Sequence, residues 1–186
     1  MNFNEYKEII KPKMSEKRYI HSVNVAKQAK HLAKIYGVEE EKALTAGILH
    51  DIAKEMPTEE QLQIITNSGI ILDNIQQRAM KLWHSITGSI YVKEVLGIED
   101  EDIINAIRFH TTGRANMSML EKIIFIADFT SAERDFKGVA TMRKKADKNL
   151  DDAMLYGFKF TFCDLTKRNL AIHPDELNCY NEIILK

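Results

Sequence analysis

The chain has 186 residues, of which 45% are hydrophobic and 28% are charged, and its formal net charge at pH 7 is −1. This length allows one domain with a proper core and leaves too little for two, and the composition is typical of a globular protein. Because acidic and basic residues nearly balance, no long-range field draws the chain to nucleic acid or to an anionic membrane, and we expect neither as a partner.

Apolar residues recur along most of the chain at the spacing of amphipathic helices, and no segment alternates as a half-buried strand would. Cap residues mark several helix ends. Ser15 and Gly37 flank the first helix, while Thr58 and Ser118 each open a capping box. The expected helices cover residues 15–36, 39–55, 58–69, 75–96, 100–110, 118–129 and 150–168, with a short last helix after Pro174. We therefore predict an all-α fold that forms a single domain over residues 1–186.

Six side chains of the kind that bind metals lie on the apolar faces of these helices. They are His21, His50, Asp51, His84, His110 and Asp128. A single histidine on an apolar face is more often a core residue with its hydrogen bonds satisfied than a ligand. Unpaired buried imidazoles and carboxylates cost several kcal/mol each, however, and one shared cation would stabilise all of them together.

His50 and Asp51 are adjacent, directly after an apolar run that includes Ala46 and Gly47. These small residues would let the backbone of another helix approach closely. Consecutive helical residues differ by about 100° around the axis, so the pair could straddle two metal ions. The alternative is that Asp51 contacts a neighbouring helix and His50 packs in the core, and this segment alone leaves both interpretations open.

The ordered series H…HD…H…H…D resembles the HD-domain metal-dependent phosphohydrolases. Five stretches are more closely similar to the YqeK family, the symmetrical diadenosine tetraphosphate hydrolases: RYIHSVNVAKQAKHLAKIYG, AGILHDIAKEMP, LWHSITGSIYV, AIRFHTTGRANMSMLEKIIFIADF and DFKGVATMRKKA. The resemblance runs from about Arg18 to Ala146. It implies an HD-domain helical bundle with a metal site at its centre, a ligand-bearing core over about 15–147, and C-terminal helices over about 148–186 that pack on it.

The resemblance also implies the ligands and the reaction. His21, His50, Asp51 and Asp128 would hold one divalent metal ion, and Asp51 would bridge to a second ion held by His84 and His110. The mixture of imidazole and carboxylate suits iron or manganese, the resemblance favours iron, and zinc stays an alternative. A hydroxide activated by both metals would split diadenosine tetraphosphate into two ADP. Asp51, Lys54 and His84 are the predicted catalytic residues.

Six further residues are candidates for binding the substrate, namely Arg18, Thr111, Thr112, Gly113, Arg134 and Arg143. Arginine forks bind phosphate in a bidentate manner, and hydroxyls and free amides after His110 could bind phosphate or ribose. The catalytic candidate Lys54 and one of these six residues have plainer alternatives. Lys54 could be a lysine whose stem lies along the surface at a helix end, and Gly113 could serve only to end a helix.

One segment departs from the family pattern. Where the family commonly reads ADYIEPxRxFPGV, this chain reads ADFTSAERDFKGV, so Ser131-Ala132 replaces Glu-Pro and Lys137 replaces the second proline. Arg134 is retained, but the loop loses two rigid φ angles and one carboxylate. We expect metal binding to be unaffected and substrate preference to be the property that changes.

The remaining features concern location and competing functions. Cys163 and Cys179 lack the spacing of a disulfide framework or a zinc knuckle, and no apolar segment resembles a signal peptide or a membrane span, so we expect a cytoplasmic protein. A dinucleotide substrate is the expected partner, and a homodimer is left open. Three alternatives remain: hydrolysis of another nucleotide such as guanosine tetraphosphate, a nucleoside triphosphate or a cyclic dinucleotide; a non-catalytic nucleotide-binding module; and a helical interaction protein.

Overall fold

The computed structural model describes residues 1–186 and contains ten α-helices, two short 3₁₀ helices and no strand, which confirms the predicted all-α class. The helices are α1 (Phe3–Ile10), a 3₁₀ helix (Lys11–Lys13), α2 (Glu16–Tyr36), α3 (Glu40–Leu49), α4 (Thr58–Asn67), a second 3₁₀ helix (Met80–Leu82), α5 (Trp83–Glu94), α6 (Glu101–Arg108), α7 (Met119–Thr130), α8 (Val139–Ala146), α9 (Leu150–Lys167) and α10 (Pro174–Ile184). None of them combines the length and the apolar composition needed to cross a bilayer.

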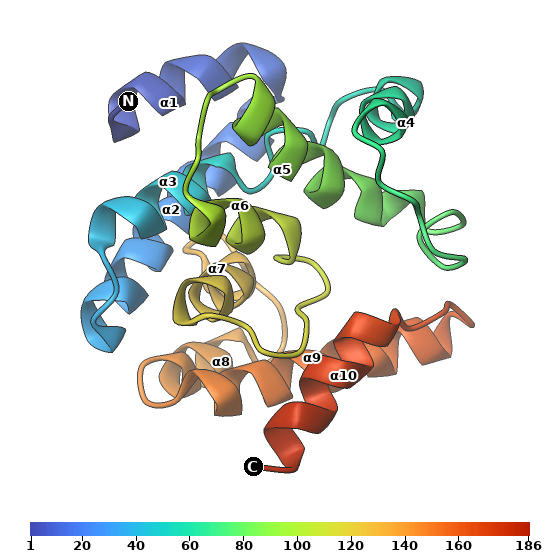
Figure 1. Ribbon diagram of the computed structural model, residues 1–186. Coiled ribbons are helices and arrows are strands. Elements are labelled where there is room, and N and C mark those ends of the chain that lie inside the picture. Colours follow the sequence, from blue (N-terminus) through green and yellow to red (C-terminus); the bar gives the residue numbers. More distant parts are fainter.

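Helices α2, α3, α6 and α7 gather at the middle of the molecule, where α2 packs along α3 and α7, and α6 lies against α3 and α7 (Figure 1). Helices α8, α9 and α10 lie together on one side, with α9 in contact with α7, α8 and α10. The main hydrophobic core draws side chains from both parts, from Tyr6 in α1 to Cys179 in α10. The C-terminal helices therefore share the core of the central helices.

Helices α2 and α3 approach each other closely at Gly47. A Cβ atom on Gly47 would lie 2.7 Å from the Cα atom of Ala26 and 3.1 Å from its backbone nitrogen. Real Cβ atoms essentially never approach a neighbour to 2.7 Å, so only glycine allows this spacing. The small residues before His50 do admit another helix, as the sequence predicts.

Caps formed by residues close in sequence are present where they were predicted, with one exception. Ser15 accepts a hydrogen bond from the Arg18 backbone N–H, and Gly37 ends α2 in the left-handed conformation at φ 70°. Ser118 forms a complete capping box with Glu121 at the start of α7. The box expected at Thr58 is wrong. Pro57 precedes the first residue of α4, no side chain caps that helix, and Gln61 donates instead to the Met56 carbonyl.

Two predicted helices are shorter than expected. The helix predicted to reach Glu55 ends at Leu49, and a series of turns with hydrogen bonds to the third residue back carries the chain through 50–56. The helix predicted from residue 75 begins at Trp83. Before it, Asp73 accepts from the backbone N–H groups of Ile75 and Gln76, and this local turn competes with helix formation. Helices α1 and α8 were not predicted.

Candidate metal centre

The structure brings together all six predicted ligand side chains at the centre of the bundle. His21 comes from α2, His84 from α5 and Asp128 from α7, while His50, Asp51 and His110 lie just after the ends of α3 and α6. The expectation that every ligand lies inside a helix is therefore wrong for these last three. Five of the side chains are buried and Asp128 is partly buried.

Asp51 lies between two groups of histidines, with one carboxylate oxygen turned to each. Its Oδ2 atom is 3.4 Å from Nε2 of His50 and 3.8 Å from Nε2 of His21. Its Oδ1 atom is 3.3 Å from Nε2 of His84 and 3.5 Å from Nε2 of His110. Asp128 adds an oxygen 3.1 Å from Nε2 of His21. The Asp51 carboxylate thus lies between two groups of side chains. One contains His21, His50 and Asp128, and the other contains His84 and His110.

Every histidine of the centre presents the same ring nitrogen to Asp51. The Nδ1 atoms of His50, His84 and His110 each lie 2.7–2.8 Å from the backbone carbonyl three residues earlier. A carbonyl can only accept, so Nδ1 carries the proton and Nε2 keeps a lone pair. The lone pairs of His84 and His110 then face each other across 3.2 Å, an arrangement that a cation between them would stabilise.

Buried polar atoms without partners lie in the same place. Nε2 of His21, Nε2 of His50 and Oδ1 of Asp51 have no hydrogen-bond partner. Leaving buried polar atoms unpaired costs about 1–3 kcal/mol each. Imidazole nitrogens and carboxylate oxygens together are the donor set of divalent transition metals. The residues present therefore fit a metal site.

The protonation states favoured by the fold also suit metal binding. Burial alone raises the pKa of Asp51, but the imidazoles of His50, His110 and His84 packed around its carboxylate hold that pKa well below its ordinary value. Burial lowers the pKa of His84 to about 4. At neutral pH the carboxylate is charged and this imidazole is neutral, and these are the forms that bind cations.

Two basic side chains lie at the edge of the centre. Arg18 donates from Nη1 to Oδ2 of Asp51 over 2.7 Å. The Nζ atom of Lys54 is 3.1 Å from Nε2 of His84, and burial lowers the pKa of this lysine. The ammonium group of Lys54 is thus directed toward His84.

The two arginines after α7 have different surroundings. Arg134 donates from Nε to the carbonyl of Asp128 over 2.8 Å and from Nη2 to its carboxylate, with 38% of its side chain exposed beside the centre. Arg143 donates to the backbone carbonyl of Thr130, the last residue of α7, and to those of Ser131, Ala132 and Arg134 in the link that follows. Its guanidinium group holds that link in place.

The segment after His110 is directed partly away from the centre. The hydroxyl of Thr111 donates to Ser85, and the hydroxyl of Thr112 donates to the carbonyl of Gly113. A Cβ atom on Gly113 would lie 3.3 Å from the sulfur atoms of Cys179 and Met117. Gly113, at φ 65°, forms the turn after α6 and lies against α10.

Glu133 is a neighbour of the centre that the sequence did not single out. Its Oε1 atom lies 2.5 Å from Nδ1 of His21, and its Oε2 atom accepts from Asn24. Burial raises the pKa of Glu133, but hydrogen bonds from His21, Ser131 and Asn24 hold it below its ordinary value. The only sequence signal was the altered loop motif, in which this glutamate occupies a variable position.

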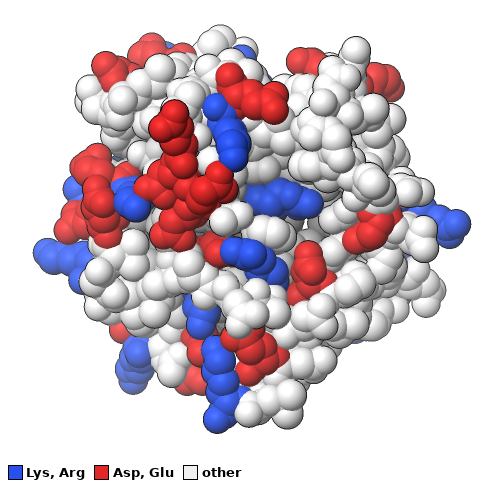
Figure 2. Space-filling model, viewed as in Figure 1, with Lys and Arg blue, Asp and Glu red and all other residues white.

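Figure 2 shows how charged side chains lie on one face of the molecule. On the face drawn in Figure 2, acidic and basic side chains are interspersed, with more acidic ones on the left half. Ion pairs such as Lys42 with Asp100 and Lys93 with Glu101 neutralise part of the surface charge. The concentration of ligand groups is a property of the interior.

Comparison with known proteins identifies the family. The family model described as HD domain matches residues 18–133. The chain is 41% identical over 186 residues to the symmetrical bis(5′-nucleosyl)-tetraphosphatase of Halalkalibacterium halodurans, covering 100% of this chain and 99% of that protein. The chain belongs to the HD-domain family of symmetrical bis(5′-nucleosyl)-tetraphosphatases.

Other members of this tetraphosphatase family and a solved structure agree. The symmetrical bis(5′-nucleosyl)-tetraphosphatase of Bacillus subtilis is 39% identical, covering 99% of this chain and 98% of that protein. A crystal structure from Clostridium acetobutylicum, described as that of a predicted HD superfamily hydrolase involved in NAD metabolism, is 42% identical in sequence. It superimposes with a TM-score of 0.96 and covers 100% of this chain and 98% of that one. The match extends over the C-terminal helices as well as the ligand-bearing part.

Proposed function

We propose that this protein is a metal-dependent phosphohydrolase that cleaves diadenosine tetraphosphate symmetrically into two molecules of ADP. The observation that carries the proposal is the pair of ligand groups on the two oxygens of Asp51, each with imidazole lone pairs directed inward. Family membership over the full length supplies the substrate class. We further propose that the enzyme acts in the cytoplasm.

The proposed cofactor is a pair of divalent cations. His21, His50, Asp51 and Asp128 would hold one, while Asp51, His84 and His110 would hold the other. This donor set favours iron, with manganese or zinc as alternatives. When bound, two such cations lower the pKa of water and neutralise charge on phosphoryl oxygens.

Basic side chains around the centre supply the remaining charge for a tetraphosphate. Arg18 and Arg134 each have a guanidinium group within hydrogen-bond distance of a proposed ligand carboxylate, so phosphates held at the centre would lie within reach of both. Lys54 lies beside His84, on the other side of Asp51 from His21. We assign to Lys54 the role of stabilising the negative charge that develops on the phosphate of the departing ADP. Its buried ammonium group is already in place and needs no reorganisation to stabilise an anion.

The other candidates contribute less directly. Thr111 has a partly buried hydroxyl near His84 through Ser85, and we keep it as a substrate contact. Arg143 would act through the link that it holds, because its hydrogen bonds are already directed to backbone carbonyls. Thr112 and Gly113 would position the backbone next to His110, since one is buried and the other packs on α10.

The test is product analysis by anion-exchange chromatography. Protein reconstituted anaerobically with ferrous iron, or with manganese, is incubated with diadenosine tetraphosphate. We expect ADP as the sole product, and no ADP with Asp51→Asn, which removes the bridging charge but keeps the shape. Asp135→Asn, which alters an exposed carboxylate in the link between α7 and α8, is the control and should retain activity. AMP with ATP would contradict symmetrical cleavage, and no product from metal-loaded protein would transfer the proposal to another nucleotide.

A further inference from the structure

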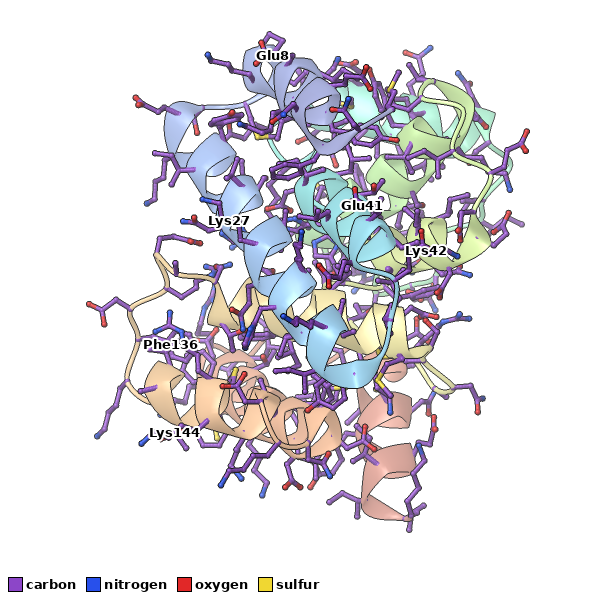
Figure 3. All side chains as sticks on the ribbon, turned by 90° about the vertical axis from the view of Figure 1, so that its left-hand side faces the viewer. Glu8, Lys27, Glu41, Lys42, Phe136 and Lys144 are labelled. Carbon is purple, nitrogen blue, oxygen red and sulfur yellow. The ribbon has the colours of Figure 1, made fainter.

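The link between α7 and α8 lies beside α2 and carries Glu133. Figure 3 shows this link as a loop, with Phe136 labelled on it, next to the helix that carries Lys27. Within it, the Glu133 carboxylate spans two residues of α2. Oε1 lies 2.5 Å from Nδ1 of His21, and Oε2 accepts from Nδ2 of Asn24 over 2.8 Å. The contact joins residues 112 positions apart in sequence.

The carboxylate of Glu133 is on the far side of the His21 ring from the metal centre. Nε2 of the ring is directed to Asp128 and Asp51, whereas Nδ1 is directed to Glu133. Glu133 is therefore a partner of a ligand and not a seventh ligand. The two ring nitrogens divide the roles, since the one that donates to a carboxylate leaves the other free to bind a cation.

His21 differs in this respect from the other three histidines. His50, His84 and His110 direct Nδ1 to neutral backbone carbonyls, whereas His21 alone has a charged acceptor. A carboxylate acceptor fixes the tautomer and raises the basicity of the opposite nitrogen more than a carbonyl does. Glu133 therefore acts on only one of the two ligand groups, the one that contains His21 and Asp128.

The Glu133 carboxylate is itself held in position. The hydroxyl of Ser131 donates to its Oε1 atom over 2.7 Å, and Asn24 holds the other oxygen. Arg143 fixes the backbone of the same link by donating to the carbonyl of Ser131 over 2.7 Å. Although 31% of the Glu133 side chain is exposed, three neighbours define its orientation. Ser131 thus supports a carboxylate two residues later in the same link.

We propose that Glu133 is a positioning residue that fixes the His21 ring and strengthens cation binding on the His21–Asp128 side of the centre. The inference rests on the proposed metal function but is separate from it, because it concerns the affinity of one half-site and not the reaction. Losing such a partner of a metal-binding histidine typically weakens metal affinity by about 10–100-fold.

The test measures Mn²⁺ binding without turnover. Equilibrium dialysis with metal quantification gives the dissociation constants of the full chain, and circular dichroism with thermal unfolding reports on the metal-free fold. Glu133→Gln keeps the shape and an acceptor oxygen but removes the charge, and we expect about 10-fold weaker binding at one site. For Glu133→Ala, we expect the Mn²⁺ affinity at that site to fall by about 100-fold. Asp135→Asn removes a similar charge from the same link and should bind like the unaltered chain.

The melting temperature of metal-free Glu133→Gln should equal that of the unaltered chain, since a purely structural role would lower it instead. Equal Mn²⁺ affinity in Glu133→Gln and the unaltered chain would overturn the inference while leaving the metal function intact. Equal losses in Glu133→Gln and Asp135→Asn would overturn it too, by showing a general charge effect. An unaltered chain that binds no divalent metal would overturn the proposed function and this inference together.

Discussion

Replacing Gly47 with alanine is expected to push α2 and α3 apart. The new Cβ atom would lie 2.7 Å from the Cα atom of Ala26, where ordinary contacts are 3.4–4 Å, so the helices must separate by about 1 Å. The obstructing atoms belong to the backbone and cannot rotate away. Overpacking of this kind costs about 3 kcal/mol at the upper end of its range. Alanine has a better helix propensity than glycine, which offsets about 1 kcal/mol of this cost and leaves a net loss of about 2 kcal/mol in the free energy of unfolding.

For a chain of this size, that loss lowers the melting temperature by about 4–8 °C. The same displacement moves His21 relative to His50, so Mn²⁺ affinity should fall as well. Differential scanning calorimetry of metal-free protein and Mn²⁺ titration check the two effects. Gly88→Ala is the matched control, because its Cβ atom would lie 3.5 Å from Ile107 and 3.6 Å from Ile52, both ordinary contacts. A Gly47→Ala protein that melts as high as Gly88→Ala would refute the reasoning.

Three further predictions concern charge and metal. Burial raises the pKa of Glu176 to about 7 from 4.5, so its contribution to stability is complete below pH 4.5 and is lost as pH rises through 7. Between pH 5 and pH 8 this loss amounts to about 2.5 kcal/mol of the urea unfolding free energy. Glu176→Gln should remove it, and identical pH dependence in both proteins would contradict the assignment. Lys54→Met should lower kcat about 100-fold in steady-state assays and leave Mn²⁺ affinity within about threefold, because Lys54 is not a ligand; an unchanged kcat would remove its assigned role. Chelation should lower the melting temperature, and Mn²⁺ at about 100 times its dissociation constant should restore about 2.7 kcal/mol per site; calorimetry that shows no shift would argue against binding to the folded chain.

Local signals were sufficient for several elements of the fold. The capping box at Ser118 and the glycine at position 37 depend on residues within one turn, and both are present. The start of α5 depends on distant contacts. Asp73 binds His173, which is 100 residues away, and Trp83 donates to the carbonyl of Gln76, so the segment before α5 takes a shape that periodicity does not indicate. Helix α8 has only 8 residues and begins after Gly138 at φ 103°, which leaves a weak pattern.

The six clustered side chains could be singled out from the sequence because they are chemically unusual on apolar faces and follow a family order, and their role as metal ligands stays a prediction. The groups that orient these side chains were harder to predict from the sequence. The carbonyls that fix the histidine tautomers come from the backbone and leave no mark in the sequence. Glu133 reaches His21 across 112 positions, and Arg143 turns to the backbone instead of the centre. The division into a ligand-bearing core over 15–147 and C-terminal helices stays a prediction.

The most direct measurement is anomalous diffraction from crystals grown anaerobically with ferrous iron, with data collected on both sides of the iron absorption edge. We predict two anomalous peaks on the two sides of the Asp51 carboxylate, one among His21, His50 and Asp128 and the other between His84 and His110. A single peak, or peaks away from Asp51, would contradict a pair of cations bridged by this residue.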